Sequence, residues 1–403
     1  MAAGRDRRGI IEGSLGEFRQ SGKAGRGTEK RLAPARGARH KPRVPSSFSA
    51  GVASSSHSFF SRPETPRCQP CREPRGSLVR LAILLAILSG WAAATATDAA
   101  EASGTRIDRT DFQGWRNAWR LTNEQVEVVV VPQVGRVMSF KFKDGENVLW
   151  SDRTLDGKQG DATGAAWINF GGDKTWPAPE AEWGQYTKRT RWMPPPAFDA
   201  LPVTARSEGS QVILTSPIDP FYGVRTIRRV SLQPGAAVME IETTYERVSG
   251  EPSRIAIWVI TQFTEPVAVY VPIPTASQFG NGHFIFGEKP WPQLTVVDRM
   301  LRVPRDPATA HKLGSDADRM LWVDGTTMCL VSAPRVPGAD YPDRGASVEV
   351  YTNPDPKTYV EVETLGPLVR MSPGDRIQHT NTYTLFRRTS TDANAEARRI
   401  LGL

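Results

Sequence analysis

The sequence predicts an all-β fold, a large antiparallel β-sandwich, from three observations. Past residue 110 the chain alternates apolar and polar residues almost throughout, which is the period of a half-buried strand. Asp-Gly and Pro-Gly pairs interrupt this alternation, as they do in hairpins and turns. Only residues 392–402 have a helical pattern, and neither a repeat nor a long linker divides the chain. So many strands in one undivided stretch favour two packed antiparallel sheets.

The clearest strand patterns come early in this stretch. Val126–Val131 is an apolar run with the length of a buried strand. From Met138 to Lys143 apolar and polar residues alternate, and Asp144-Gly145 then turns the chain toward Val148–Trp150, so we expect a hairpin. Residues 239–246 alternate in the same way, which predicts one face toward the core and one toward water.

The remaining strands are predicted from shorter runs of the same kind. Trp322–Met328 repeats the hairpin pattern around an Asp-Gly pair. Further strands are expected at 211–216, 224–232, 254–262, 267–272, 294–302, 328–333, 346–352, 358–365 and 376–387. By contrast, residues 167–198 are dense in Trp, Pro and Gly and are expected to form a long loop. A long loop inside a compact domain is more often functional than idle.

The charge distribution argues against a nucleic-acid-binding protein. The chain has 403 residues, with 51 Lys and Arg against 43 Asp and Glu, a formal net charge of +8. Residues 1–97 hold 17 of the basic and 6 of the acidic side chains, so residues 98–403 hold 34 and 37. The positive excess is confined to the leader, and we expect no nucleic-acid partner. Residues 98–403 are expected to form one domain.

The leader has two expected parts. Residues 1–75 are rich in Arg, Gly, Ser and Pro, so we expect them to be disordered and to precede a true translation start near residue 78. Residues 76–97 have the layout of a secretory signal peptide, with the apolar run Leu81–Leu88 after a basic residue and before small residues. A bilayer span needs roughly 20 apolar residues, so a cleaved signal is favoured over a membrane anchor. We expect a periplasmic or secreted protein without a stable membrane span.

Familiar catalytic signatures are missing from the sequence. It contains no nucleophile elbow, zinc-protease motif, phosphate-binding loop or dinucleotide fingerprint after a strand. His283, His311 and His379 are widely spaced, which argues against a three-histidine metal site. Cys329 is the one cysteine after residue 98, so no internal disulfide can form there. We therefore expect no metal and no cofactor.

Tryptophans provide the first candidate for a binding site. Four of them fall within 26 positions: Trp167, Trp176, Trp183 and Trp192. Indole faces stack on the C–H faces of pyranose rings, while Asp, Asn and Lys bind sugar hydroxyls. The same pattern fits a structural tryptophan cluster that closes one end of the sandwich, and composition does not separate these alternatives.

Paired carboxylates provide the second candidate. On a strand, Tyr359, Glu361 and Glu363 share one face, and Val360 and Val362 share the other. Carboxylates two residues apart lie roughly 6–7 Å from each other. This proximity would raise one pKa, as general acid–base chemistry requires, if the face lines a cleft. The alternative, which the pattern alone favours, is a solvated outer face.

Four segments of the chain resemble a bacterial family, domain of unknown function 4380. They are Pro132–Phe140, Asn169–Glu180, Ile257–Gln262 and Glu361–Pro367, and they follow one another in that family's order. The string Gly-Gly-Asp-Lys-Thr-Trp-Pro-Ala-Pro in the second segment is the most specific. The resemblance covers about residues 115–388. The family is similar to the galactose-mutarotase-like superfamily, which implies a large antiparallel β-sandwich that binds sugars on a concave face.

The resemblance also implies roles for individual residues. Aldose 1-epimerases of this superfamily have a catalytic base in a Leu-Glu-Thr-Gln context, which implies that role for Glu363, with Glu361 as a second acid–base candidate. The general-acid histidine of those enzymes falls at Gln262, and their second histidine is missing as well. The resemblance therefore implies the fold more firmly than the activity, because His283 or Lys174 would have to supply the proton.

Together these patterns predict a carbohydrate site. Its catalytic residues would be Glu361 and Glu363, and its substrate-binding residues Arg136, Asn169, Asp173, Lys174, Trp176, Gln262 and His283. We expect an exported monomer that binds a sugar or glycan. If it is an enzyme, we expect an isomerase of the epimerase or mutarotase type, acting on an aldose or sugar acid. The alternative is a non-catalytic envelope protein with a glycan-binding or structural role.

Overall fold

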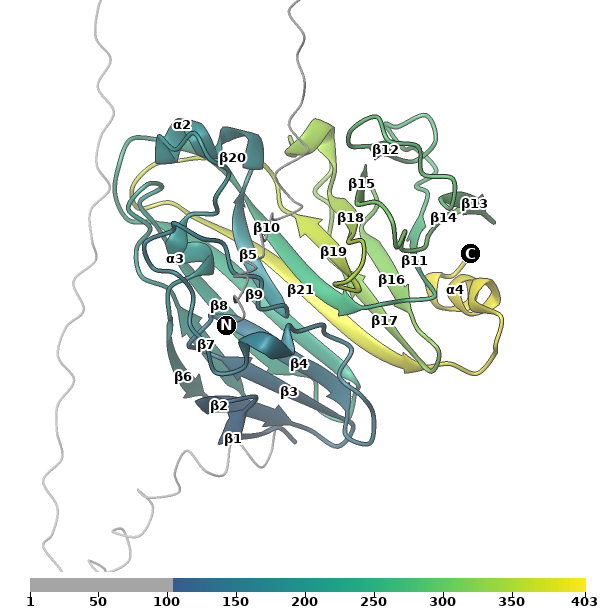
Figure 1. Ribbon diagram of the computed structural model, residues 1–403, viewed down its shortest axis with the longest axis horizontal. Coiled ribbons are helices and arrows are strands. Elements are labelled where there is room, and N and C mark those ends of the chain that lie inside the picture. The colour runs from purple at the N-terminus through teal and green to yellow at the C-terminus, as the bar shows by residue number, and fades with distance from the viewer. Residues whose placement is uncertain (1–103) are drawn as a thin grey trace, which may run out of the picture. The chain divides into compact units, whose positions relative to one another are not determined.

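Two antiparallel β-sheets form the body of residues 104–403, the part of the chain that the computed structural model describes (Figure 1). The predicted β-sandwich is therefore confirmed. The predicted leader, residues 1–75, and the predicted signal peptide, residues 76–97, lie outside the described residues. None of the helices in the described part is long and apolar enough to cross a membrane.

The larger sheet has eleven strands. In spatial order ten of them are β1 (Arg106–Phe112), β2 (Trp115–Thr122), β3 (Val126–Val131), β4 (Arg136–Phe142), β5 (Asp173–Ala178), β10 (Ser253–Thr264), β19 (Tyr359–Leu365), β18 (Val348–Thr352), β15 (His311–Ser315) and β12 (Phe284–Ile285). The eleventh, β20 (Val369–Met371), pairs with the beginning of β10.

The smaller sheet has ten strands. Their order is β13 (Thr295–Val297), β14 (Met300–Val303), β11 (Ala268–Pro272), β16 (Arg319–Val323), β17 (Thr327–Ser332), β21 (Arg376–Arg387), β9 (Val238–Arg247), β8 (Val224–Leu232), β7 (Gln211–Thr215) and β6 (Thr204–Glu208). Short helices connect the strands: α2 (Trp183–Thr187), α3 (Pro196–Asp199) and the 3-10 turns η2 (Arg153–Leu155), η3 (Glu180–Glu182) and η4 (Asp343–Gly345). The predicted C-terminal helix is α4 (Ala393–Leu401).

Most predicted strands are present, and their ends agree within a few residues. The runs at 224–232 and 376–387 coincide with β8 and β21. The predicted single strand at 294–302 is wrong, because it is the hairpin β13–β14. Asp298 and Arg299 turn the chain there with φ angles of 48° and 62°. Gly is the residue that most clearly indicates such a turn in a sequence, and neither position has one.

Two further differences concern the N-terminal part of the larger sheet. The expected strand at Val148–Trp150 is reduced to an isolated bridge between Leu149 and Phe263. The strands β1 and β2 are absent from the predicted set. β1 is an edge strand in which no residue is fully buried, so it lacks the clear alternation of a half-buried strand.

The main hydrophobic core fills the space between the two sheets. Val360 and Val362 of β19 face this space with 0% and 1% exposure, and Met239 and Ile241 of β9 belong to the same core from the smaller sheet. Burial of this apolar surface drives the packing of the two layers. Alternate residues of β19 must therefore face the other side of the larger sheet.

The predicted loop at 167–198 contains the strand β5, near the centre of the larger sheet. Pro177 argues against a central strand by its lack of an N–H group. The structure accommodates Pro177 because β5 pairs with β10 along its whole length but with β4 at Asp173 alone. The Pro177 carbonyl points to the unpaired side, where it accepts a hydrogen bond from the Trp183 indole at 2.7 Å.

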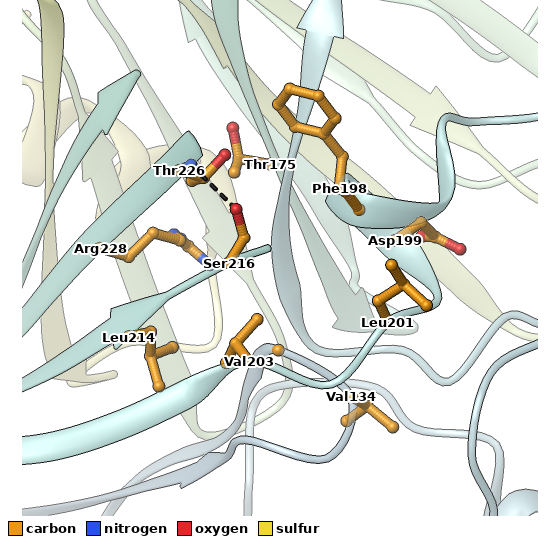
Figure 2. Close-up of a pocket in the computed structure, with 12 residues that line it drawn as sticks. Val134, Thr175, Phe198, Asp199, Leu201, Val203, Leu214, Ser216, Thr226 and Arg228 are labelled. Atoms are coloured by element: carbon orange, nitrogen blue, oxygen red, sulfur yellow. Dashed lines mark hydrogen bonds between the residues drawn. The ribbon is translucent and has the colours of Figure 1, made fainter. Parts of the chain in front are cut away.

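A small cavity lies between β5, α3 and the strands β7 and β8 (Figure 2). Its volume is about 20 Å³, and Thr175, Phe198, Leu214 and Arg228 are among its lining residues. A single water needs roughly 10–15 Å³ of such space. The cavity therefore has room for one water and not for a substrate.

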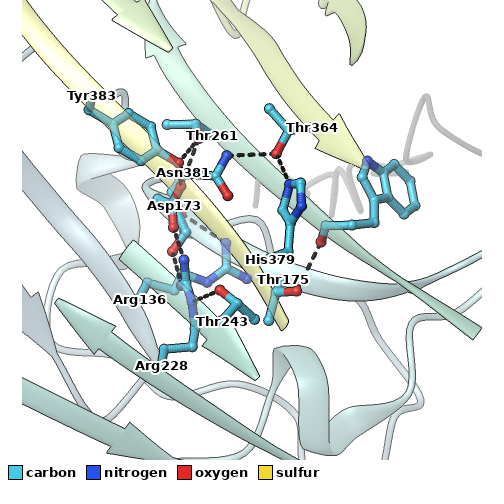
Figure 3. A network of polar contacts seen from close by, with 12 residues as sticks. Arg136, Asp173, Thr175, Arg228, Thr243, Thr261, Thr364, His379, Asn381 and Tyr383 are labelled. Carbon is cyan, nitrogen blue, oxygen red and sulfur yellow. Dashed lines mark hydrogen bonds and ion pairs between the residues drawn. The ribbon is translucent and has the colours of Figure 1, made fainter. Parts of the chain in front are cut away.

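A buried polar network joins the two sheets around Asp173 (Figure 3). Its carboxylate forms an ion pair with Arg228 of β8 and accepts hydrogen bonds from Tyr383 Oη at 2.6 Å and Thr261 Oγ1 at 2.7 Å. Asp173 is 0% exposed. The prediction that it contacts a substrate is corrected here: its side chain lies between the sheets, where the protein itself supplies its partners.

Replacing Asp173 by Ala should lower the free energy of unfolding by about 3–5 kcal/mol, because it leaves the Arg228 charge buried without a counter-charge. Urea denaturation followed by circular dichroism measures this loss. Glu127→Ala is the matched control, because it breaks the partly exposed pair with Lys141 and should cost less than about 1 kcal/mol. Equal losses for the two variants would contradict the structural role of Asp173.

Candidate functional site

The outer face of β19 carries the two glutamates that the sequence singles out. Tyr359, Glu361 and Glu363 point away from the smaller sheet, opposite the core valines of the same strand. Their exposures are 2%, 5% and 0%. The alternative of a solvated outer face is therefore wrong for these residues, and both carboxyl groups lie in a poorly hydrated environment.

The strand register gathers three further side chains on this face. Gln262 of β10 lies opposite Glu361, and Ile260 lies opposite Glu363. On its other side, Ile260 lies opposite Lys174 of β5. Lys174, Gln262 and the two glutamates, which are far apart in sequence, thus occupy one buried patch across three neighbouring strands.

Two segments that flank β5, residues 150–172 and 179–203, cover this patch; we call them the cover. Asp199, the last residue of α3, fixes the second segment to the sheet. Its Oδ1 atom accepts hydrogen bonds from Arg136 Nη2 at 2.7 Å and from Trp176 Nε1 at 3.0 Å. Arg136 is 1% exposed, so its ion pair with Asp199 is buried. Arg136, predicted to bind substrate, therefore attaches the cover to the sheet.

A cavity of about 410 Å³ lies between the cover and the larger sheet. Ligand cavities in proteins typically have volumes of roughly 300–1,000 Å³. The larger sheet contributes the lining residues Trp176, Trp258, Lys312, Tyr351 and Glu361. The cover contributes Glu180, Trp183, Arg189, Arg191 and Trp192. Phe286 and Asp343 also line the cavity.

Tryptophans form the aromatic part of this wall. Trp176 packs edge to face on Trp183 and Trp258, with ring centroids 5.4 and 5.6 Å apart. Trp192 lies 5.5 Å from Trp167 in the same manner. The sequence left open whether the tryptophans form a structural cluster or a binding surface. In the structure they pack on one another, and four of them also line the cavity.

Of the two glutamates on β19, Glu361 is the one that lines the cavity. Its Oε1 atom accepts a hydrogen bond from Gln262 Nε2 at 2.7 Å. Burial raises the pKa of Glu361 to about 7, although the positive charge of Lys174 acts in the opposite direction. A carboxyl group with a pKa near 7 can either accept or donate a proton at neutral pH, as general acid–base catalysis requires.

Glu363, the base implied by the family resemblance, is held by other side chains. Its Oε2 atom accepts hydrogen bonds from Trp258 Nε1 at 2.7 Å and from Lys312 Nζ at 3.0 Å. Lys312 also forms an ion pair with Glu349 at 2.7 Å. Burial alone would lower the pKa of Lys312, but the two carboxylates hold it well above its usual value.

Lys174 is the basic group on this face that lacks such a partner. It is 1% exposed, and its Nζ atom has no hydrogen-bond acceptor among residues 104–403. The ammonium group lies 4.0 Å from the ring centroid of Trp176 and 5.4 Å from that of Trp167. Burial, and next the nearby charge of Arg136, lower the pKa of Lys174 to about 8.

Several other buried polar atoms of this region also lack partners within the described part of the chain. The donors are Arg136 Nε, Trp167 Nε1 and Lys174 Nζ. The acceptors include Gln262 Oε1 and Glu363 Oε1. Each buried group without a partner costs roughly 1–3 kcal/mol. These side chains lie behind the cavity wall, because Lys174 contacts Trp176 and Gln262 donates to Glu361, and they mark a candidate place for a polar ligand.

The remaining predicted site residues lie elsewhere. Asn169 is 6% exposed, and its Oδ1 atom accepts a hydrogen bond from Gly171 N at 3.3 Å; it does not line the cavity. His283 lies on the partly exposed approach to β12, with Nδ1 3.0 Å from the carbonyl of Asn281. It is not among the cavity-lining residues either.

Other residues of the site are absent from the predicted set. Lys312 is missed because the sequence does not indicate β15, whose residues 311–315 include Gly and Ser. Glu349 and Tyr351 belong to a predicted strand, 346–352. Their alternation with valines could have placed them beside Glu363 and Glu361, respectively, once the pairing of β18 with β19 was known. Asp199 carries no sequence signal, since its role depends on the path of the cover.

The arrangement supports proton transfer to or from a bound polar molecule. Glu361 is at the cavity surface with a pKa suited to this task, and the other side chains provide aromatic surface and charge. Among residues 104–403 no group of three or more His, Cys, Asp or Glu side chains is arranged to hold a metal ion.

Comparison with known proteins adds a family and a set of similar folds. The family model described as Domain of unknown function (DUF4380) matches residues 117–386. No curated protein matches the chain. Many solved structures have similar folds, and three of them represent the set.

The first is a galactose mutarotase-like protein from Lactobacillus casei ATCC 334, with 10% identity and a TM-score of 0.48 over 67% of this chain and 100% of that one. The second is a protein provisionally named as an aldose 1-epimerase from Escherichia coli K12, with 11% identity and a TM-score of 0.46 over 71% of this chain and 100% of that one. The third is a galactose 1-epimerase from Lactobacillus acidophilus NCFM, with 9% identity and a TM-score of 0.39 over 70% of this chain and 98% of that one.

Replacing Asp199 by Ala should release the cover, because Arg136 and Trp176 lose their common acceptor. Limited trypsin digestion tests this at Lys188, Arg189 and Arg191 of the cover, where cleavage should become faster than in the unchanged protein. Asp298→Ala removes an exposed pair with Arg398 and serves as the control with unchanged cleavage. Unchanged cleavage of the Asp199 variant would show that other contacts hold the cover.

Proposed function

We propose, from the premise that this chain belongs to the family described as Domain of unknown function (DUF4380), that it binds a carbohydrate in the cavity under the cover. We further propose that Glu361 transfers a proton on the bound sugar. The observation that carries this proposal is the set of unpartnered donors and acceptors beside a tryptophan-lined cavity.

Sugars fit this chemistry because each hydroxyl group both donates and accepts hydrogen bonds. The free oxygens of Gln262 and Glu363 can accept from hydroxyls, and the free N–H groups can donate to them. The indole faces of Trp176, Trp192 and Trp258 supply the apolar surface on which a pyranose ring packs. A purely apolar ligand would leave the polar atoms without partners.

The reaction that best suits Glu361 is the opening and closing of a sugar ring, as in an epimerase or mutarotase-type isomerase. In this reaction a base removes the proton of the anomeric hydroxyl, the carbonyl double bond forms as the ring C–O bond breaks, and the ring oxygen takes up a proton from the protonated base or from water. Glu361 is suited to the first step because it lines the cavity and its pKa of about 7 lets it exchange protons at neutral pH.

We also propose that the protein is exported. The support is the apolar run Leu81–Leu88, which follows a basic residue and precedes small residues. Mass spectrometry of the mature protein tests this. An N-terminus after residue 92 agrees with a cleaved signal, and peptides from residues 1–75 contradict it.

Titration of the full-length protein with a panel of monosaccharides and sugar acids should change its tryptophan fluorescence in a saturable way. Trp176→Ala should weaken binding by about tenfold or more, because it removes the indole against which the sugar packs. Trp119→Phe, on β2 in the core between the sheets, is the control with unchanged affinity. A panel without any binding would contradict the proposal.

The rate of anomer interconversion should rise as the pH increases through about 7, because the base form of Glu361 is the ionised one. Glu361→Gln should lower the rate by about 10²–10⁴-fold and leave the affinity for the sugar nearly unchanged. Exchange between the anomeric proton signals in NMR measures this rate. Sugar binding with the same rate in both proteins would instead support the non-catalytic glycan-binding alternative.

A further inference from the structure

The unpartnered polar atoms lie directly behind the cavity wall, since Lys174 contacts the lining Trp176 and Gln262 donates to the lining Glu361, and they are separated by type. Three donors lie toward β4 and β5: Arg136 Nε, Lys174 Nζ and, from the cover, Trp167 Nε1. The acceptors Gln262 Oε1 and Glu363 Oε1 belong to the next strands, β10 and β19. A neutral sugar, whose hydroxyls donate and accept everywhere, does not require such a separation.

The donor side also has a buried positive charge without a hydrogen-bonded partner. Arg136 is paired with Asp199, and Lys312 with Glu349 and Glu363, but Lys174 has no hydrogen-bonded acceptor in the described part of the chain. Buried charges are ordinarily paired, because an isolated one is costly to remove from water. Contact with the rings of Trp176 and Trp167 compensates only part of this cost.

We infer that the sugar of the proposed site is a sugar acid whose carboxylate is bound by Lys174 Nζ and Trp167 Nε1, beside the guanidinium of Arg136. A carboxylate is an acceptor-only group, which matches three donors, and its charge balances the ammonium group. The hydroxyls of the same sugar then face Gln262 and Glu363. This inference rests on the proposed carbohydrate site and narrows its substrate class to uronic or similar acids.

The surrounding charges give the pH dependence of such binding. Lys174 faces Arg136 of β4, Asp199 of the cover, and Glu361 and Glu363 of β19. Above a pH of about 8 the free Lys174 loses its charge, and above about 7 Glu361 gains a negative one. Both changes disfavour a bound carboxylate, so the affinity for a sugar acid should fall as the pH rises from 6 to 9.

Paired ligands test the inference with the full-length protein. Isothermal titration calorimetry compares D-glucuronate with D-glucose, and D-galacturonate with D-galactose, at pH 6.5 and pH 9. We expect one of the acids to bind about tenfold or more tightly than its parent sugar at pH 6.5, and the preference to shrink at pH 9. Lys174→Met should abolish the preference, because the acid should lose much more affinity than its parent sugar does. Lys141→Met, on the distal part of β4, should keep the preference.

The thermal stability of the ligand-free variants separates a binding role from a structural one. Lys174→Met should melt at the same or a higher temperature than the unchanged protein, because it removes a buried charged group that has no hydrogen-bonded partner. Marked destabilisation would assign Lys174 to structure and overturn the inference. Equal affinity for acid and parent sugar would also overturn it, while the proposed carbohydrate site would stand. Failure of all four ligands to bind would count against both proposals.

Discussion

Burial of both faces of the larger sheet is the constraint on which the rest of the structure depends. A sheet of a two-layer sandwich normally has one face in the core and one in water. Here the inner face of β19 meets the smaller sheet through Val360 and Val362, and the outer face, with Glu361 and Glu363, lies under the cover. Period-2 alternation thus places charged groups in a desolvated layer, and this loss of hydration is the main reason why the pKa of Glu361 is raised.

The cover depends on the same layer for its attachment. Asp199 joins it to Arg136 of β4 and to Trp176 of β5, and Asp173 joins β5 to the smaller sheet on the opposite face. Neighbouring residues of β5 therefore point to opposite faces of the larger sheet. Asp173 joins the strand to the smaller sheet, and Lys174 faces the covered patch. Asp173 has protein partners on both carboxylate oxygens, whereas Lys174 keeps its donors free.

The sequence carries much of the fold and a smaller part of the site. Alternation and turn residues predict long strands such as β8 and β21, because each strand shows its own half-buried face. They do not predict β5. This strand contains Lys, Trp and Pro and is buried on both faces, so its sequence lacks the alternation of apolar and polar residues that indicates a half-buried strand. Glu361 and Glu363 are identifiable as a pair on one face, but their burial depends on the distant cover. Lys312 becomes part of the site only through strand pairing, which no local pattern encodes.

The unpartnered polar atoms of the covered face mark it as a candidate ligand site. A folded protein gains nothing from a buried donor without an acceptor, and replacement of such a group by an apolar one is often neutral or stabilising. The inter-sheet network around Asp173 shows that this chain can pair its buried polar groups: its carboxylate, Tyr383 and Thr261 bond to one another. On the covered face, a few ångströms from a tryptophan ring, Lys174 remains unpaired. The same chain that completes one buried network leaves the other incomplete beside a cavity, which is the arrangement expected where a ligand supplies the missing partners.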